Sequence, residues 1–169
     1  MQIIKYIMLF FVFTSSSLIG KYLSKKYVYR LEELEELRNS LNILKTKIKF
    51  TYEPLPEIFE EISKVSKNNV SQIFKDAKEN LRNDNAGIAW KQAVEQNQNN
   101  LKDEDKEILK MMSKMLGQTD VEGQISQIEI TEKFLDTKIK DAQIEKQKNE
   151  KLYTKLGTTI GLVIVLILI

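Results

Sequence analysis

The chain has 169 residues, with 26 Lys and Arg against 24 Asp and Glu, and a formal net charge of +2. It contains no His and no Cys, which excludes the usual zinc sites, Ser-His-Asp and Cys-His nucleophiles, redox dithiols and disulfides. With only six Gly and two Pro, the sequence offers little for β-hairpin turns or phosphate loops, and the composition predicts an all-α fold.

The first twenty residues are mostly apolar and carry one charged side chain, Lys5. Residues 3–20 reach the lower length limit for a membrane-spanning helix, and we expect them to form one. A signal peptide is the alternative, with Lys5 as its basic region, residues 7–13 as its apolar core and Ser15 and Ser17 at the cleavage site. The helical pattern that follows continues without a turn residue, which favours the uncleaved helix.

Residues 27–50 carry an apolar stripe with helical spacing. Its members recur at intervals of three and four: Tyr27, Leu31, Leu34, Leu37, Leu41, Leu44 and Ile48. We therefore expect the membrane helix to run straight into this one. Pro54 and Pro56 end it, because proline lacks the amide donor and biases its predecessor to extended geometry, and Pro56 suits the first turn of the next helix.

After Pro54 we predict four short helices, the second to the fifth of the chain, and a long sixth helix. The second helix stops at Asn68-Asn69, and the third stops at residues 83–85. Asp84 or Asn85 then caps the fourth helix. Their apolar faces consist of Leu55, Ile58, Phe59, Ile62 and Val65 in the second, Val70, Ile73, Phe74, Ala77 and Leu81 in the third, and Ala89, Trp90, Ala93 and Val94 in the fourth.

The fifth helix is expected to begin near Asp103, because acidic residues complement a helix N-terminus, and to end at Gly117. Its buried face is expected to hold Ile108, Leu109, Met112, Met115 and Leu116. Thr119 and Glu122 fit a capping box for the sixth helix.

The sixth helix has an apolar stripe and no Gly or Pro between residues 123 and 157, so we expect it to run unbroken into a second membrane segment. The stripe consists of Ile125, Ile128, Leu135, Ile139 and Ala142. The predicted segment is 152–169, with Lys155 snorkelling towards water. A soluble core helix is the alternative, but residues 156–169 have no polar face and would require burial on all sides.

The predicted fold is an all-α antiparallel bundle of about six helices, with N- and C-terminal transmembrane helices side by side in one bilayer. Basic residues cluster on the inner flank of both membrane segments: Lys21, Lys25, Lys26, Arg30, Lys140, Lys146, Lys148, Lys151 and Lys155. Because such residues stay on the cytoplasmic side, residues 21–155 are predicted to form a cytoplasmic helical domain.

No catalytic constellation is found along the chain. The acidic run from Asp103 to Glu107 lacks the Gly that an EF-hand needs at its sixth position, where Ile108 stands, so we interpret it as a solvated helix start. We expect no metal, no cofactor and no small-molecule substrate. Acidic residues interleave the lysines, which argues against nucleic-acid binding. The prediction is a non-enzymatic protein that holds or contacts other proteins.

Two sets of residues are candidates for protein contacts. Glu32, Glu33, Glu35 and Glu36 are expected around the outside of the first long helix, as a docking face for a basic partner or simply as solvated charge. Trp90 is expected in the core, and only an exposed indole would favour an interface.

Small residues spaced by four occur in both membrane segments. They are Ser16 with Gly20 and Gly157 with Gly161. Such pairs let helices approach closely in lipid, although the spacing also arises by chance.

Several segments, in order along the whole chain, resemble the stage III sporulation protein AB family of endospore-forming bacteria. They are PLPEIFEEIS, GIAWKQAV, LKDEDKEIL, LGQTDVEGQ and the ending EKQKNEKLYTKLGTTIGLVIVLILI. The most specific pieces are residues 116–120, Gln124 and residues 148–152. The Lys- and Asn-rich composition and the interruption by Lys5 depart from the family.

The resemblance implies a component of the membrane channel between mother cell and forespore that endospore formation requires, located in the cell membrane around the forespore with its domain in the mother-cell cytoplasm. That family is similar to a cytoplasmic helical domain of the F-type platform protein of type II secretion. By that analogy the partners are the ATPase stage III sporulation protein AA and other stage III sporulation A-operon membrane proteins. The alternative is a tail-anchored coiled-coil scaffold or receptor without a link to secretion, suggested by the leucine stripe.

Overall fold

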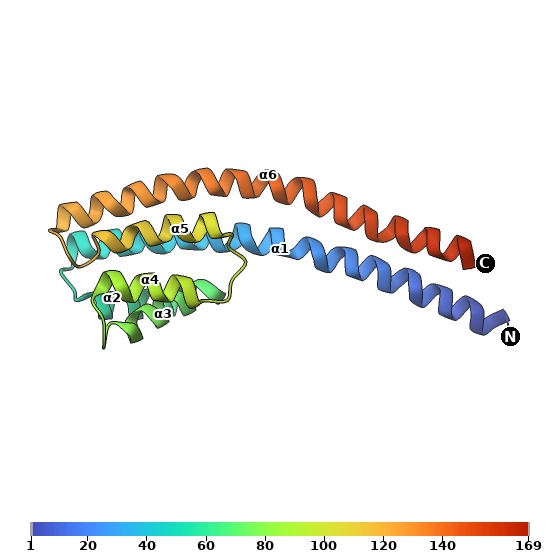
Figure 1. Cartoon of the computed structure of the whole chain (residues 1–169), viewed down its shortest axis with the longest axis horizontal. Helices are drawn as coiled ribbons and strands as arrows, with labels where there is room; N and C mark the ends of the chain where they lie inside the picture. The colour runs from blue at the N-terminus through green and yellow to red at the C-terminus, as the bar shows by residue number, and fades with distance from the viewer. Residues whose placement is uncertain (1, 169) are drawn as a thin grey trace. The chain divides into compact units, whose positions relative to one another are not determined.

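A computed structural model describes residues 2–168, including the side chains of all of these except residues 2, 3 and 68. Within this range the fold is entirely helical, as predicted (Figure 1). The helices are α1 (Gln2–Phe50), α2 (Leu55–Val65), α3 (Asn68–Asn80), α4 (Ala86–Gln96), α5 (Asp103–Met111), a 3₁₀ turn (Met112–Lys114) and α6 (Val121–Leu168).

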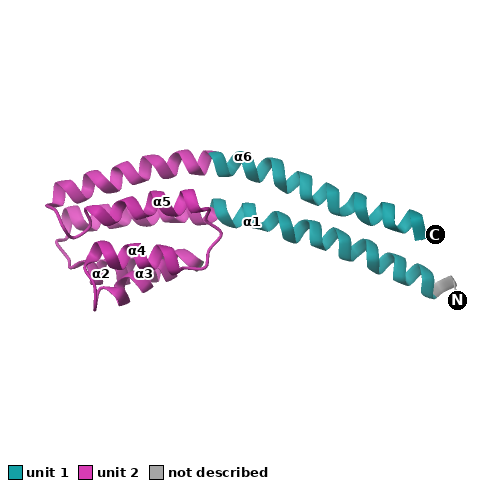
Figure 2. Cartoon of the chain, in the orientation of Figure 1, with its two compact units in different colours: residues 1–31, 141–169 teal, residues 32–140 magenta. Residues whose placement is uncertain are grey.

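The chain divides into two compact units (Figure 2). Unit 1 consists of residues 1–31 and 141–169, and unit 2 of residues 32–140. The long helices α1 and α6 each contribute residues to both units. Neither helix is interrupted where the apolar ends of the sequence meet its polar middle, as expected.

The leucine stripe of α1 lies inside unit 2 from Leu34 onward, whereas Tyr27 and Leu31 belong to unit 1. Leu34, Leu37, Leu41 and Leu44 are fully buried. Ion pairs join this part of α1 to α6, from Arg38 to Asp136 at 2.9 Å and from Lys45 to Glu132 at 2.5 Å. The stripe is thus covered by the chain's own domain, with charged side chains along its border.

Three aromatic rings form the centre of unit 2. The ring centroids of Phe59, Phe74 and Trp90 lie 5.3–6.0 Å apart, and all three side chains are fully buried. The indole Nε1 of Trp90 donates a 2.8 Å hydrogen bond to the Leu109 carbonyl, so its one polar atom is satisfied. Trp90 is therefore a core residue that joins α4 to α5, as expected.

Two caps define helix starts in unit 2. The side chain of Asn85 accepts a 3.0 Å hydrogen bond from the Ile88 amide and caps α4, which decides between the two candidates there. The expected capping box of Thr119 and Glu122 is wrong, because Asp120 is the residue before α6 and its carboxylate accepts from the Gly123 amide at 2.9 Å.

Other local expectations also need correction. Asn68 and Asn69 begin α3 instead of ending the preceding helix, which already stops at Val65. Val65 is exposed because it is the last residue of α2. Met115 is exposed as well, at 41%, because the 3₁₀ turn before it changes the angular spacing of side chains, leaving Met112 and Leu116 buried.

Unit 1 contains the apolar ends of α1 and α6. Both helices are long and apolar enough to cross a membrane, with a mean hydropathy of 1.4 for α1 and 1.6 for α6 over their most apolar stretches. Many large apolar side chains in unit 1 face outward, among them Phe10, Phe11, Leu166 and Ile167. These properties are typical of helices that contact lipid, and they support membrane association.

Candidate functional site

In unit 1, the four small residues noted in the sequence lie at one contact between α1 and α6, which we call the small-residue contact. The Ser16 hydroxyl donates a 2.8 Å hydrogen bond to the Gly157 carbonyl. A Cβ atom on Gly20 would lie 2.9 Å from the Gly157 Cα, and one on Gly161 would lie 3.1 Å from the Ser16 Cβ. Larger side chains would therefore separate the two backbones.

The same helix pair continues towards the polar part of unit 1. The rings of Tyr27 and Tyr153 stack with centroids 5.9 Å apart. Arg30, whose side chain is buried, forms a 2.8 Å ion pair with Glu145. These contacts fix the register of the two helices beyond the small-residue contact.

The four glutamates at the start of the α1 segment in unit 2 are not equivalent. Glu32 and Glu35 are exposed. Glu36 is half-buried and accepts a 3.2 Å hydrogen bond from the Lys67 amide. Glu33 is buried, so the expectation that all four lie on the outside of the helix is wrong for this residue.

The Glu33 carboxylate joins three segments that are distant in sequence. It accepts hydrogen bonds from the Asn69 Nδ2 at 2.7 Å, the Asn100 amide at 2.8 Å and the Asn100 Nδ2 at 2.7 Å. Three donors offset the cost of burying the charge. Glu33 thus fastens the first turn of α3 and the loop between α4 and α5 to α1.

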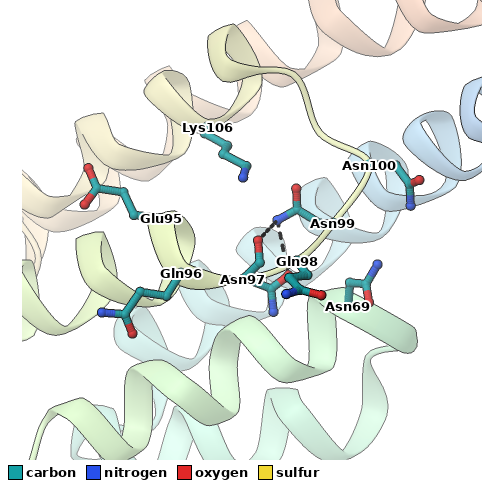
Figure 3. Close-up of a pocket in the computed structure, with 8 residues that line it drawn as sticks. All are labelled: Asn69, Glu95, Gln96, Asn97, Gln98, Asn99, Asn100 and Lys106. Atoms are coloured by element: carbon teal, nitrogen blue, oxygen red, sulfur yellow. Dashed lines mark hydrogen bonds between the residues drawn. The ribbon is translucent and has the colours of Figure 1, made fainter.

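Beside this junction lies a polar hollow of about 540 Å³, which we call the amide hollow (Figure 3). Six of its lining residues are amides, and the full lining is Asn69, Glu95, Gln96, Asn97, Gln98, Asn99, Asn100 and Lys106. The Asn99 side chain is held by the Asn97 carbonyl and side-chain oxygen, both at 3.2 Å. Figure 3 shows Lys106 directed towards Asn99, with Glu95 and Gln96 pointing away.

Side-chain amides both donate and accept hydrogen bonds, so the amide hollow suits a peptide-like or similarly neutral polar group. Within residues 2–168, no group of three or more His, Cys, Asp or Glu is placed to hold a metal ion. The hollow thus offers a polar binding surface in unit 2. The sequence signal for the hollow is the polar NQNN run of residues 97–100, which directly follows α4.

One surface carboxylate of unit 2 has a strongly shifted pKa. Hydrogen bonds and attraction from Lys64 and Lys78 lower the pKa of Glu60 to about 2. The Lys64 ammonium lies 2.8 Å from one Glu60 oxygen within α2, and the Lys78 ammonium lies 2.7 Å from the other oxygen and joins α3 to α2.

Comparison with known proteins gives a consistent result. The profile of a family described as stage III sporulation protein AB matches residues 5–169. The stage III sporulation protein AB of Bacillus subtilis (strain 168) is 28% identical over 162 residues, which cover 94% of this chain and 95% of that protein. A solved structure of stage III sporulation protein AB is similar with a TM-score of 0.64 and 26% identity, covering 69% of this chain and 95% of that one.

Proposed function

Because the chain belongs to the stage III sporulation protein AB family, we propose that it is a membrane-anchored, non-enzymatic platform component of the channel between mother cell and forespore. In this role its helical domain lies in the mother-cell cytoplasm and docks the ATPase stage III sporulation protein AA, alongside the other A-operon membrane proteins. The apolar ends, residues 3–20 and 152–169, anchor the domain formed by residues 21–155.

The observation that carries this proposal is the construction of α1 and α6. Each helix is continuous, with an outward-facing apolar part in unit 1 and a packed part in unit 2. A domain whose first and last helices are both anchored is attached to the membrane at two points. This suits a fixed base for a moving ATPase better than a flexible tether.

A tail-anchored coiled-coil scaffold is supported less well. Such a scaffold needs the leucine stripe of α1 for a partner helix. Leu34, Leu37, Leu41 and Leu44 are instead fully buried within unit 2.

The docking experiment uses the full chain in nanodiscs and the purified ATPase of the same organism. We propose the exposed carboxylates Glu32 and Glu35 as contacts for basic residues of the ATPase. Glu32→Lys with Glu35→Lys should weaken binding at least about tenfold by biolayer interferometry, because two attractive charges become repulsive. Glu57→Lys with Glu79→Lys is the matched control, since both residues are exposed in unit 2 and the charge change is the same.

Equal binding by wild type, variant and control would remove these glutamates from the interface. No binding of wild type at any concentration tested would remove the ATPase as the partner.

The sidedness of the domain is tested separately. The chain has no Cys, so Lys114→Cys, at an exposed position of unit 2, gives a single reactive thiol. We expect a membrane-impermeant maleimide to label it only after the cells are permeabilised. Labelling in intact cells would place the domain outside and contradict the proposal.

A further inference from the structure

The outer face of α1 in unit 1 has a hollow where the apolar segment ends. It measures about 430 Å³ and is lined by Leu18, Ile19, Lys21, Tyr22 and Lys25. Leu18, Ile19 and Tyr22 are 60–75% exposed, so the hollow opens to the surroundings of the helix. Because residues three, four and seven apart share a helix face, Leu18, Lys21, Tyr22 and Lys25 line one strip of surface. Ile19 borders this strip and lines the same hollow.

The charge around this hollow is strongly positive. Residues 1–31 contain no Asp or Glu. In the described part of unit 1, neither the Lys21 nor the Lys25 ammonium forms an ion pair, whereas Lys26 lies 5.0 Å from the Tyr27 ring centroid and Arg30 is paired with Glu145. Two exposed cations beside an apolar surface thus face outward without a counter-charge.

We propose that this hollow binds the headgroup of an anionic phospholipid. The phosphodiester lies between the ammonium groups of Lys21 and Lys25, and an acyl chain follows Leu18 and Ile19 towards the N-terminus of α1. Tyr22 lies at the boundary, where its ring contacts the lipid and its hydroxyl reaches water.

The apolar lining decides between a lipid and a free phosphate as the source of the anion. Lysines are point charges with flexible stems and do not hold a small anion by geometry alone. Apolar contact with an acyl chain adds affinity that a free phosphate lacks. The proposal rests on membrane insertion of α1, which is part of the proposed function, and is independent of ATPase docking.

The test uses the full chain in nanodiscs with equal amounts of phosphatidylglycerol and phosphatidylcholine, and counts by native mass spectrometry the lipids that remain bound. The wild type should retain phosphatidylglycerol in preference to phosphatidylcholine. For the double variant Lys21→Gln with Lys25→Gln, this preference should fall about twentyfold. Each lysine near a membrane surface strengthens the binding of anionic lipid by roughly fivefold, and two lysines are removed. Lys21→Arg with Lys25→Arg should restore it.

The matched control is Lys146→Gln with Lys148→Gln, which removes the same charge from α6 in unit 1. We expect this pair to change the preference less than about threefold, because these lysines lie farther from the apolar segment and are screened. Adding free glycerol 3-phosphate should not displace the bound phosphatidylglycerol.

Three results would overturn the proposal: no lipid preference in the wild type, equal losses in both double variants, or displacement by glycerol 3-phosphate. Co-flotation of the wild type with vesicles reports membrane insertion independently. Failure to insert would contradict the proposed function itself, whereas insertion without lipid preference would contradict only the lipid site.

Discussion

Units 1 and 2 share the same two long helices but are stabilised in different ways (Figure 2). In unit 1, α1 and α6 meet through glycines and the Ser16 hydroxyl, while large apolar side chains face outward. In unit 2, large side chains such as Trp90 and Phe59 fill a closed core. In lipid, burying apolar side chains gains little, so close backbone packing holds the helices, whereas in water burial of large side chains dominates.

The two units also differ in charge. Unit 1 has nine basic and three acidic residues, a net charge of +6, and unit 2 has 17 basic and 21 acidic residues, a net charge of −4. The overall value of +2 conceals this division. A basic unit suits an anionic membrane surface, and an acidic unit is repelled from it.

The largest expected effect comes from the core of unit 2. Trp90→Ala removes the central ring and leaves the Leu109 carbonyl without its donor, which should destabilise unit 2 by about 3 to 5 kcal/mol. Urea unfolding of the full chain in detergent, followed by circular dichroism, measures this. Cross-linking of Tyr27→Cys to Tyr153→Cys by a short bismaleimide reports on unit 1 and should be unchanged. If Trp90→Ala also reduced this cross-link, helix pairing in unit 1 would depend on the core of unit 2, and the two units would not be stabilised separately.

The next effect comes from the buried carboxylate of unit 2. Glu33→Ala leaves three donors of Asn69 and Asn100 without an acceptor, which should cost about 2 to 3 kcal/mol. Amide hydrogen exchange at Asn100 should become faster. Glu32→Ala, at an exposed position, is the control and should stay within about 0.5 kcal/mol of wild type. Equal effects of the two variants would contradict the role assigned to Glu33.

A smaller effect is expected at the small-residue contact of unit 1. Gly20→Leu places a side chain against the Tyr153 carbonyl, 2.5 Å from the position of a Cβ, and should weaken helix pairing by about 1 to 3 kcal/mol. The Tyr27→Cys to Tyr153→Cys cross-link should decrease several-fold. Thr159→Leu, on the exposed surface of α6, should leave the yield unchanged. A full yield for Gly20→Leu would show that the helices pair through another face.

The smallest expected effect is the pH dependence of the Glu60 cluster. The pKa of Glu60 is lowered from its ordinary value to about 2, so its interaction with Lys64 and Lys78 stabilises the fold above about pH 4.5 and is lost as the pH falls through 2. Carboxyl NMR titration measures this pKa. Lys78→Gln should raise it, and an ordinary pKa in wild type would contradict the ion pairs.

The helices could be predicted from the sequence because each signal is local. The three-four spacing of Leu34, Leu37 and Leu41 and the prolines after Phe50 depend only on neighbours in the chain. The burial of Glu33 could not be predicted, because it depends on Asn69 and Asn100, which reach it only in the folded domain. The position of a residue along a helix predicts the helix face on which it lies. Its hydrogen-bond partners, in contrast, belong to segments that are distant in the sequence.

The spacing of Ser16, Gly20, Gly157 and Gly161 identified residues that suit close packing, but it did not say that they contact one another. Whether they contact one another depends on the register of α1 against α6. Interactions outside the apolar segments, such as the ion pair of Arg30 with Glu145, help to set this register. The cap at Asp120 was missed for a simpler reason: Thr119 and Asp120 both suit an N-cap, and sequence preference does not separate adjacent candidates.

The ion pairs between α1 and α6 in unit 2 have a consequence for synthesis on the ribosome. Arg38 and Asp136 are 98 residues apart, and Lys45 and Glu132 are 87 residues apart. At ordinary elongation rates, α6 follows α1 by roughly 5 to 20 s. During this interval the leucine stripe of α1 lacks its last covering helix, while α2, α3 and α4, which contact one another in sequence order, are already complete. The stripe of α1 therefore gains its ion-paired neighbour α6 only at the end of synthesis.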